Sequence, residues 1–217
     1  LINFAPTSDP ASLEQALASR VGPRIRACLL STTFSNPLGA TLPEEAKRRL
    51  LRVCREHDVA LIEDDIYGDL NFAGARPLPM KAFDRHGQVM LCSSFSKTLA
   101  PGFRVGWVAA PEAIAAKLEM AKQAEDLCSG ALDQRVVHEA CRRGVLATHL
   151  PALRAHYQRK RDVMSAALER TMAGRISWAP PRGGFFLWAA LRGGLTGDQL
   201  LPFAKARGVI YVVGSAF

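Results

Sequence analysis

A lysine flanked by hydroxyl groups is the feature of this sequence that is best suited to chemistry. Lys97 follows an apolar run that ends in Ser94 and Ser96, and a second cation, Arg104, lies seven residues further on. Neighbouring cations and partial burial lower the pKa of a lysine amine and make it a nucleophile, whereas hydroxyls and a guanidinium hold phosphate groups. This segment therefore indicates a reactive amine beside an anion-binding cluster.

Two earlier segments also place polar groups after apolar runs. Asn36 lies in the segment SNPLG, and Asp64 and Tyr67 lie in DDIYGDL. Each feature has an ordinary explanation by itself, because Asn-Pro and glycine form turns, and aspartates and lysines are common at protein surfaces. Together they supply an amine, a carboxylate, a phenol, an amide, hydroxyls and a guanidinium. That is the set of groups that the cofactor pyridoxal phosphate requires.

This chemistry gives each residue an expected role. Lys97 would form a Schiff base with pyridoxal phosphate, and Asp64 would keep the ring nitrogen of the cofactor protonated so that the ring accepts electrons. Tyr67 and Asn36 would hydrogen-bond the phenolic oxygen of the ring. The phosphate would be held by hydroxyl and guanidinium donors, namely Ser94, Ser96 and Arg104. We expect Lys97, Asp64 and Tyr67 to be the catalytic residues.

Metal chemistry is not expected, because the five cysteines and five histidines show no spacing typical of metal ligands. The net charge of +8 leaves anionic partners open, but the basic residues are scattered at helical spacing and do not favour nucleic acid. The sequence has no apolar run of membrane-spanning length and no signal-like segment at Leu1. We therefore expect a cytoplasmic location and no membrane partner.

The first half of the chain alternates apolar runs with a helical pattern. Buried strands are predicted at residues 26–31, 59–63 and 89–92, with a further strand at 105–109 that could run antiparallel. A capping-box pattern at Thr41 predicts a helix that ends near His57 and keeps Lys47 on its polar side. Continuous apolar strands predict a mostly parallel sheet covered on both faces. Ligands bind beyond the carboxyl ends of such strands, so the three polar segments should meet at one edge.

The second half is predicted to be helical before a smaller α+β lobe. The expected helices cover residues 113–128, 132–143 and 150–172, and another begins at a capping box formed by Thr196 and Gln199. The expected strands are residues 176–178, 185–191 and 208–213. We accordingly assign residues 1–145 to a large cofactor-binding α/β domain, and residues 146–217 to a bridging helix and part of a small domain.

The motifs resemble those of fold-type I pyridoxal-phosphate enzymes. SFSKTLAPGFRVGW resembles their Schiff-base lysine segment, NPLG their NP-x-G turn, DDIYGDL their acid-x-x-tyrosine motif, and PRGGFFLW their substrate-contacting segment. The likeness is greatest to class I/II aminotransferases of the 2-aminoadipate and kynurenine group, and to the aminotransferase domain of MocR-type regulators. It implies an enzyme that moves an amino group between an amino acid and a 2-keto acid. It also implies that Lys97 carries the proton in that exchange, first as base and then as acid.

The same resemblance implies a homodimer with its site at the interface. Family members are longer, so we expect a fragment that lacks part of the phosphate site and the arginine that binds the substrate carboxylate. Three alternatives remain open. One is another reaction on the same cofactor, such as β-elimination or decarboxylation. Another is the sensing domain of a regulator, which would contact nucleic acid only if a winged-helix domain precedes Leu1. The last is an α/β domain that binds some other anion.

Overall fold

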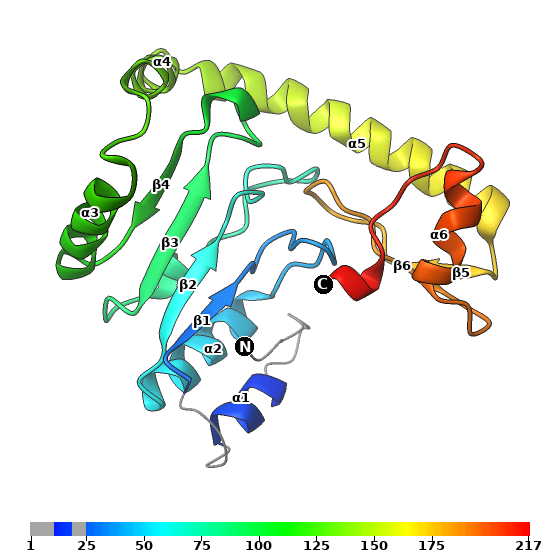
Figure 1. The fold of residues 1–217 in the computed structure, drawn as a ribbon, viewed down its shortest axis with the longest axis horizontal. Helices are drawn as coiled ribbons and strands as arrows, with labels where there is room; N and C mark the ends of the chain where they lie inside the picture. The colour runs from blue at the N-terminus through cyan, green and yellow to red at the C-terminus, as the bar shows by residue number, and fades with distance from the viewer. Residues whose placement is uncertain (1–10, 19–24) are drawn as a thin grey trace.

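The polar segments are carried by a four-stranded sheet with the strand order β1-β2-β3-β4 (Figure 1). The structure is a computed structural model that describes residues 11–18 and 25–217. The segment at Leu1, which was expected not to be a signal peptide, lies outside the described residues. The first three strands run parallel and the last pairs antiparallel with β3. They are β1 (Ala27–Leu30), β2 (Ala60–Asp64), β3 (Val89–Ser94) and β4 (Gly106–Ala109). The prediction of a mostly parallel sheet is confirmed.

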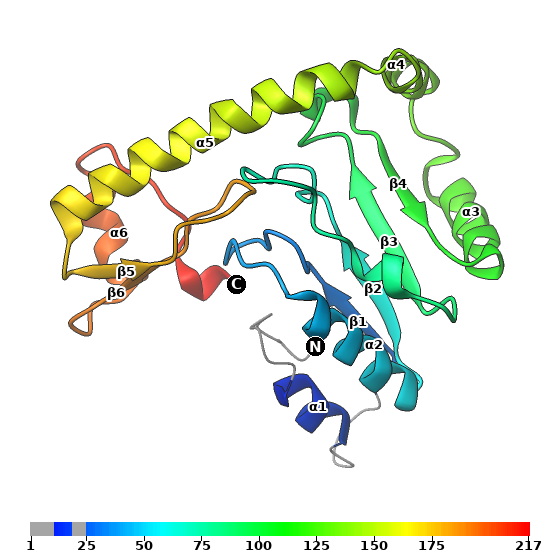
Figure 2. The same cartoon turned by 180° about the vertical axis from the view of Figure 1, so that it is seen from behind.

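The hydrophobic core lies between this sheet and the helices on one of its faces. Helix α1 (Ala11–Ala18), helix α2 (Glu44–Glu56) and the 3₁₀ turn η1 (Met80–Phe83) contribute to it (Figure 2). Its buried residues include Leu50, Cys54, Leu61 and Val89. On the opposite face Leu29 is 69% exposed. Among the described residues, therefore, helices do not cover both faces of the sheet as expected.

The predicted capping box at Thr41 is wrong. Helix α2 begins at Glu44, and its N-cap residue, Pro43, makes no side-chain cap. The hydroxyl of Thr41 instead accepts a hydrogen bond from the backbone N–H of Phe34 at 3.1 Å. Thr41 thus stabilises the turn that follows β1 rather than the start of the helix.

Three helices follow the sheet, and the last of them leads to a second, two-stranded sheet. They are α3 (Glu112–Asp126), α4 (Ala131–Arg142) and α5 (Val145–Met172), and a 3₁₀ turn, η2 (Pro101–Phe103), precedes β4. Both views show α5 extending from the four-stranded sheet to the small one (Figures 1 and 2). On α5, Val163 is 71% exposed and Met164 is also exposed. Within the described ranges, no helix is both long and apolar enough to cross a bilayer.

The small sheet pairs β5 (Ile176–Trp178) with β6 (Ala189–Leu191) in antiparallel fashion. The predicted capping box at Thr196 and Gln199 is confirmed at the start of α6 (Gly197–Lys205). Residues 208–213, predicted to be a strand, are irregular and lead to the 3₁₀ turn η3 (Gly214–Ala216). Tyr211 donates its hydroxyl hydrogen to the Gly197 carbonyl at 2.8 Å, which ties this segment to α6 rather than to a neighbouring strand.

The segment before β6 packs onto the loops at the carboxyl end of the large sheet. The Gly184 N–H donates to the Leu70 carbonyl at 3.1 Å, and the Phe72 N–H donates to the Arg182 carbonyl at 2.9 Å. A Cβ on Gly183 would overlap the ring of Phe34 and lie 2.5 Å from the Leu70 oxygen. Only glycine therefore allows this close approach between the two parts of the chain.

The substitution Gly183→Ala tests this close approach. It should lower the free energy of unfolding by about 1–3 kcal/mol, because overpacking forces the aromatic ring and the backbone apart. Gly102→Ala is the matched control, since within the described ranges no atom beyond its two chain neighbours lies within 4 Å of its added Cβ. Denaturant unfolding of both variants measures the difference. Equal stability of the two variants would contradict the tight fit.

Candidate active site at the strand ends

The end of β2 sends consecutive carboxylates to opposite faces of the sheet. Glu63 and Asp65 are buried on the side that faces α2, whereas Asp64 is half-buried on the other side. This alternation follows from the two-residue period of a β-strand. Asp64 pairs in register with Cys92 of β3, so it lies beside the strand that leads to Lys97. Of these three carboxylates, Asp64 therefore lies on the face of the sheet where the predicted site residues were expected to meet.

Asp64 and Tyr67 form an electrostatic pair at this edge. Burial raises the pKa of Asp64, although a hydrogen bond from the Ile66 backbone opposes the shift. Burial also raises the pKa of Tyr67, and the charge of Asp64 raises it further. Tyr67 therefore presents a protonated phenol at neutral pH, which can donate a hydrogen bond to an anionic oxygen.

The serines and the arginine that follow β3 form one polar cluster. Ser94 Oγ lies 3.0 Å from Ser96 Oγ, and the Ser96 N–H donates to Ser94 Oγ at 3.1 Å. Arg104 Nη1 donates to Ser96 Oγ at 3.3 Å. Arg104 is exposed and has a left-handed backbone with φ of 53°. Two hydroxyls and a guanidinium thus converge in a way that suits an oxyanion.

Lys97 lies in the turn next to this cluster and is half-buried. Throughout residues 11–18 and 25–217, no hydrogen bond or ion pair involves its amine. The turn itself is held by hydrogen bonds from the N–H groups of Thr98 and Leu99 to the Phe95 carbonyl, at 3.3 and 2.8 Å. The amine is therefore placed by a fixed backbone and remains available to react.

Asn36 is the predicted site residue that the structure joins least to the others. It is exposed in the turn after β1, which is closed by a hydrogen bond from the Gly39 N–H to the Ser35 carbonyl at 2.7 Å. Its side chain makes no contact with Asp64 or Tyr67 among the interactions found in the described residues. The structure thus brings Asn36 to the expected end of the sheet but forms no bond through its amide.

Aromatic side chains from the small-sheet segment surround Tyr67. The rings of Phe185 and Phe186 lie 5.7 and 5.5 Å from the Tyr67 ring, both edge-on. Phe34 and Leu70 complete this apolar cluster. The segment PRGGFFLW therefore contacts the candidate site, and it excludes water from one side of the Tyr67 ring.

The sequence reading missed the buried polar groups behind the site. Lys47, expected on a polar face, is 2% exposed. Its amine donates to Thr33 Oγ1 at 3.2 Å and to the Leu78 carbonyl at 2.7 Å. Glu63 accepts hydrogen bonds from the Thr32 hydroxyl at 2.5 Å and from the N–H groups of Met80 and Lys81 at 2.7 and 3.0 Å. One signal was available, because Lys47 shares the helical spacing of the buried residues Leu50 and Cys54.

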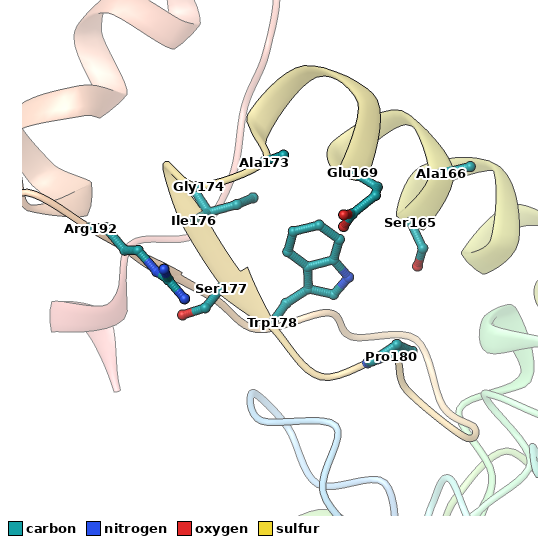
Figure 3. A pocket seen from close by; sticks show the side chains of 10 residues that line it. All are labelled: Ser165, Ala166, Glu169, Ala173, Gly174, Ile176, Ser177, Trp178, Pro180 and Arg192. Atoms are coloured by element: carbon teal, nitrogen blue, oxygen red, sulfur yellow. The ribbon is translucent and has the colours of Figure 1, made fainter.

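A cavity of about 530 Å³ lies apart from these residues, between the end of α5 and β5 (Figure 3). Ser165, Glu169, Trp178 and Arg192 are among its lining residues. None of the predicted site residues lines it. The chemistry of the strand ends, rather than this cavity, therefore locates the candidate site.

Comparisons with known proteins identify the family of the chain. The profile of the family Aminotransferase class I and II matches residues 6–214. Aromatic-amino-acid aminotransferase 1 of Thermococcus litoralis is 40% identical over 90% of this chain and 47% of its own length. An uncharacterized HTH-type transcriptional regulator of Bacillus subtilis, YdfD, is 32% identical over 90% of this chain and 41% of its own.

A solved structure matches in three dimensions as well. The crystal structure of Pyrococcus horikoshii kynurenine aminotransferase, in complex with PMP, superposes with a TM-score of 0.88 and 37% identity. The match covers 93% of this chain and 50% of that one. The chain thus spans about half the length of the aminotransferases that it matches.

The buried carboxyl of Asp65 gives a prediction about pH and stability. Burial raises its pKa from 3.8 to about 7, although Arg76 opposes the shift. Between these two pH values the folded state holds a proton that the unfolded state has released, so the contribution of Asp65 to stability falls as pH rises. Asp65→Asn should remove this fall, which is on the order of a few kcal/mol.

Urea unfolding of both proteins from pH 4 to pH 7 measures the effect. The free energy of unfolding of the wild type should decline relative to that of Asp65→Asn across this range. Parallel pH profiles would show that Asp65 is not a buried group of raised pKa.

Proposed function

The chain belongs to the Aminotransferase class I and II family, and on that premise we propose that the whole protein is a pyridoxal-phosphate-dependent aminotransferase. It would move an amino group between an amino acid and a 2-keto acid. The observation that carries the proposal is the polar cluster of Ser94, Ser96 and Arg104 in the turn that holds Lys97, at the end of a strand that pairs with the strand ending in Asp64. Amine, oxyanion cluster and carboxylate all belong to adjacent strand ends.

The residues present fit this cofactor by the chemistry of their groups. When bound, pyridoxal phosphate supplies an electron-accepting ring that stabilises negative charge on the substrate α-carbon. Lys97 offers an amine without a competing partner in the described part of the chain. The hydroxyls and guanidinium near it suit a phosphate dianion, and Arg104 stays charged at any working pH. These features support the assignment of the site to pyridoxal phosphate.

The proposal gives each predicted site residue a role in proton transfer or in binding of the cofactor. Lys97 would be the Schiff-base residue and would transfer the proton from the substrate α-carbon as general base and then acid. Asp64 would retain a proton at the ring nitrogen of the cofactor. Tyr67 and Asn36 would donate hydrogen bonds to its phenolic oxygen. The phosphate would be bound by Ser94, Ser96 and Arg104.

The proposal also covers the domain organisation, the oligomeric state and the substrates of the protein. Residues 1–145 would form part of the large cofactor-binding domain, and residues 146–217 the bridging helix and part of the small domain. The two separate sheets, joined by α5, support that division. We further propose a cytoplasmic homodimer whose site lies at the subunit interface and whose substrates are amino acids and 2-keto acids. Aromatic substrates are compatible with the names of its relatives from Thermococcus and Pyrococcus.

A second candidate is the sensing domain of a transcription regulator. The similarity to the HTH-type regulator YdfD favours it, because that relative is 32% identical over 90% of this chain. The same cofactor site would then respond to a ligand, and nucleic acid would be bound by a separate winged-helix domain. The gene sequence upstream of Leu1 distinguishes the two, since only a regulator would encode that domain there.

The test of the proposed enzyme is Lys97→Ala in the full-length protein. The substitution should abolish the borohydride-fixed attachment of the cofactor to the protein and lower transamination at least ~10³-fold, because both the covalent link and the proton carrier are lost. Lys122→Ala is the matched control, since the one partner of Lys122 among the described residues is Asp126, in an exposed ion pair. Transamination of Lys97→Ala at the wild-type rate would refute the proposal.

A further inference from the structure

Arg76 links two carboxylates that lie on either side of Tyr67. It comes from the loop between β2 and η1. Its Nη2 donates to Asp65 Oδ2 at 2.5 Å, and its Nε lies 3.0 Å from Asp69 Oδ1. One guanidinium therefore spans the turn of residues 65–69, whose central residue is Tyr67.

The contact with Asp65 lies away from water, where burial raises the pKa of the carboxyl and the charge of Arg76 opposes that rise. The Asp65 side chain is 0% exposed, whereas that of Arg76 is 32% exposed. Lys47 is also near enough to act on Asp65 electrostatically, but its amine bonds Thr33 and Leu78 instead. Among the described residues, Arg76 is thus the cation that hydrogen-bonds Asp65. Without Arg76 the buried carboxyl would have to bear its charge unpaired or take up a proton, and in either case the contact is lost.

Gly68 lets the guanidinium approach the backbone of the turn. A Cβ at this position would overlap Asp65 Oδ1 and lie 3.0 Å from both Nε and Nη2 of Arg76. The ion pair is therefore packed directly under the peptide that follows Tyr67.

Other hydrogen bonds hold the two ends of the turn. The Asp65 N–H donates to the Cys92 carbonyl at 2.9 Å, and Ser93 Oγ donates to the Asp65 carbonyl at 3.0 Å. At the other end, Arg154 Nε of α5 donates to the Asp69 carbonyl at 2.6 Å. Arg76 adds the connection across the middle, between the strand that carries Asp64 and the residues after Tyr67.

We propose that Arg76 is a positioning residue of the active site, which fixes Tyr67 and Asp64 by bridging Asp65 and Asp69 beneath Gly68. The inference rests on the proposed aminotransferase function. Arg76 touches neither substrate nor cofactor in this role. It acts through the turn, so its loss should displace the phenol and lower turnover more than it weakens substrate binding.

The experiment compares Arg76→Ala and Arg76→Lys in the full-length holoenzyme. We expect kcat of Arg76→Ala to fall about 10- to 100-fold with KM nearly unchanged, since displaced supporting groups have effects of that size. Arg76→Lys should recover part of the loss, because one ammonium can replace one of the two contacts. Added guanidinium ion should also restore Arg76→Ala, because the site of Arg76 is partly open to solvent. Arg143→Ala, which removes an exposed ion pair with Glu139, is the control and should leave kcat unchanged.

Hydrogen exchange of the peptide that covers residues 65–72 gives a second measurement that does not depend on activity. Exchange there should be faster in Arg76→Ala than in the wild type and in Arg143→Ala. Wild-type kcat together with unchanged exchange in Arg76→Ala would overturn the inference. A fall in kcat that neither lysine nor guanidinium reverses would also overturn it. An inactive wild type would instead refute the proposed function, while hydrogen exchange would still report whether Arg76 holds the turn.

Discussion

The burial of carboxylates at the end of β2 is the constraint on which the site depends. Because successive residues of a strand face opposite ways, Glu63 and Asp65 enter the core whenever Asp64 faces the other side of the sheet. Buried carboxylates need hydrogen bonds and countercharges. Lys47 and Arg76 supply positive charge, and the backbone of η1 supplies N–H donors. The surrounding elements are thereby fixed around one half-buried carboxylate.

A second close contact joins the two parts of the chain at this place. Gly183 and Gly184 pack on Phe34 and Leu70 with no room for a side chain. This docking brings the rings of Phe185 and Phe186 onto Tyr67, a residue from a distant part of the chain. The site is therefore polar on the side of β3 and apolar on the side of the small sheet. Such an environment orients a polar ligand while it limits access of water.

The sequence predicts those parts of the fold that depend on local patterns. The apolar runs locate β1, β2 and β3 to within about two residues, since buried parallel strands carry few polar residues. The parallel topology then brings Asp64 and Lys97 to one edge. The parts of the fold that the sequence does not predict depend on contacts between residues far apart in the chain. The buried amine of Lys47 bonds Thr33 and Leu78, and the irregular segment 208–213 contacts α6 through the bond from Tyr211 to Gly197. No local pattern indicates that Arg76 would bridge Asp65 and Asp69.

The central claim is that these strand ends place the amine of Lys97 at the carbonyl of pyridoxal phosphate. Borohydride reduction of the full-length protein, followed by mass spectrometry of its peptides, tests that claim most directly. The account predicts a phosphopyridoxyl group on Lys97 in the peptide that contains Ser94 and Ser96. A phosphopyridoxyl group on another lysine, or no modified peptide from a protein saturated with the cofactor, would contradict it.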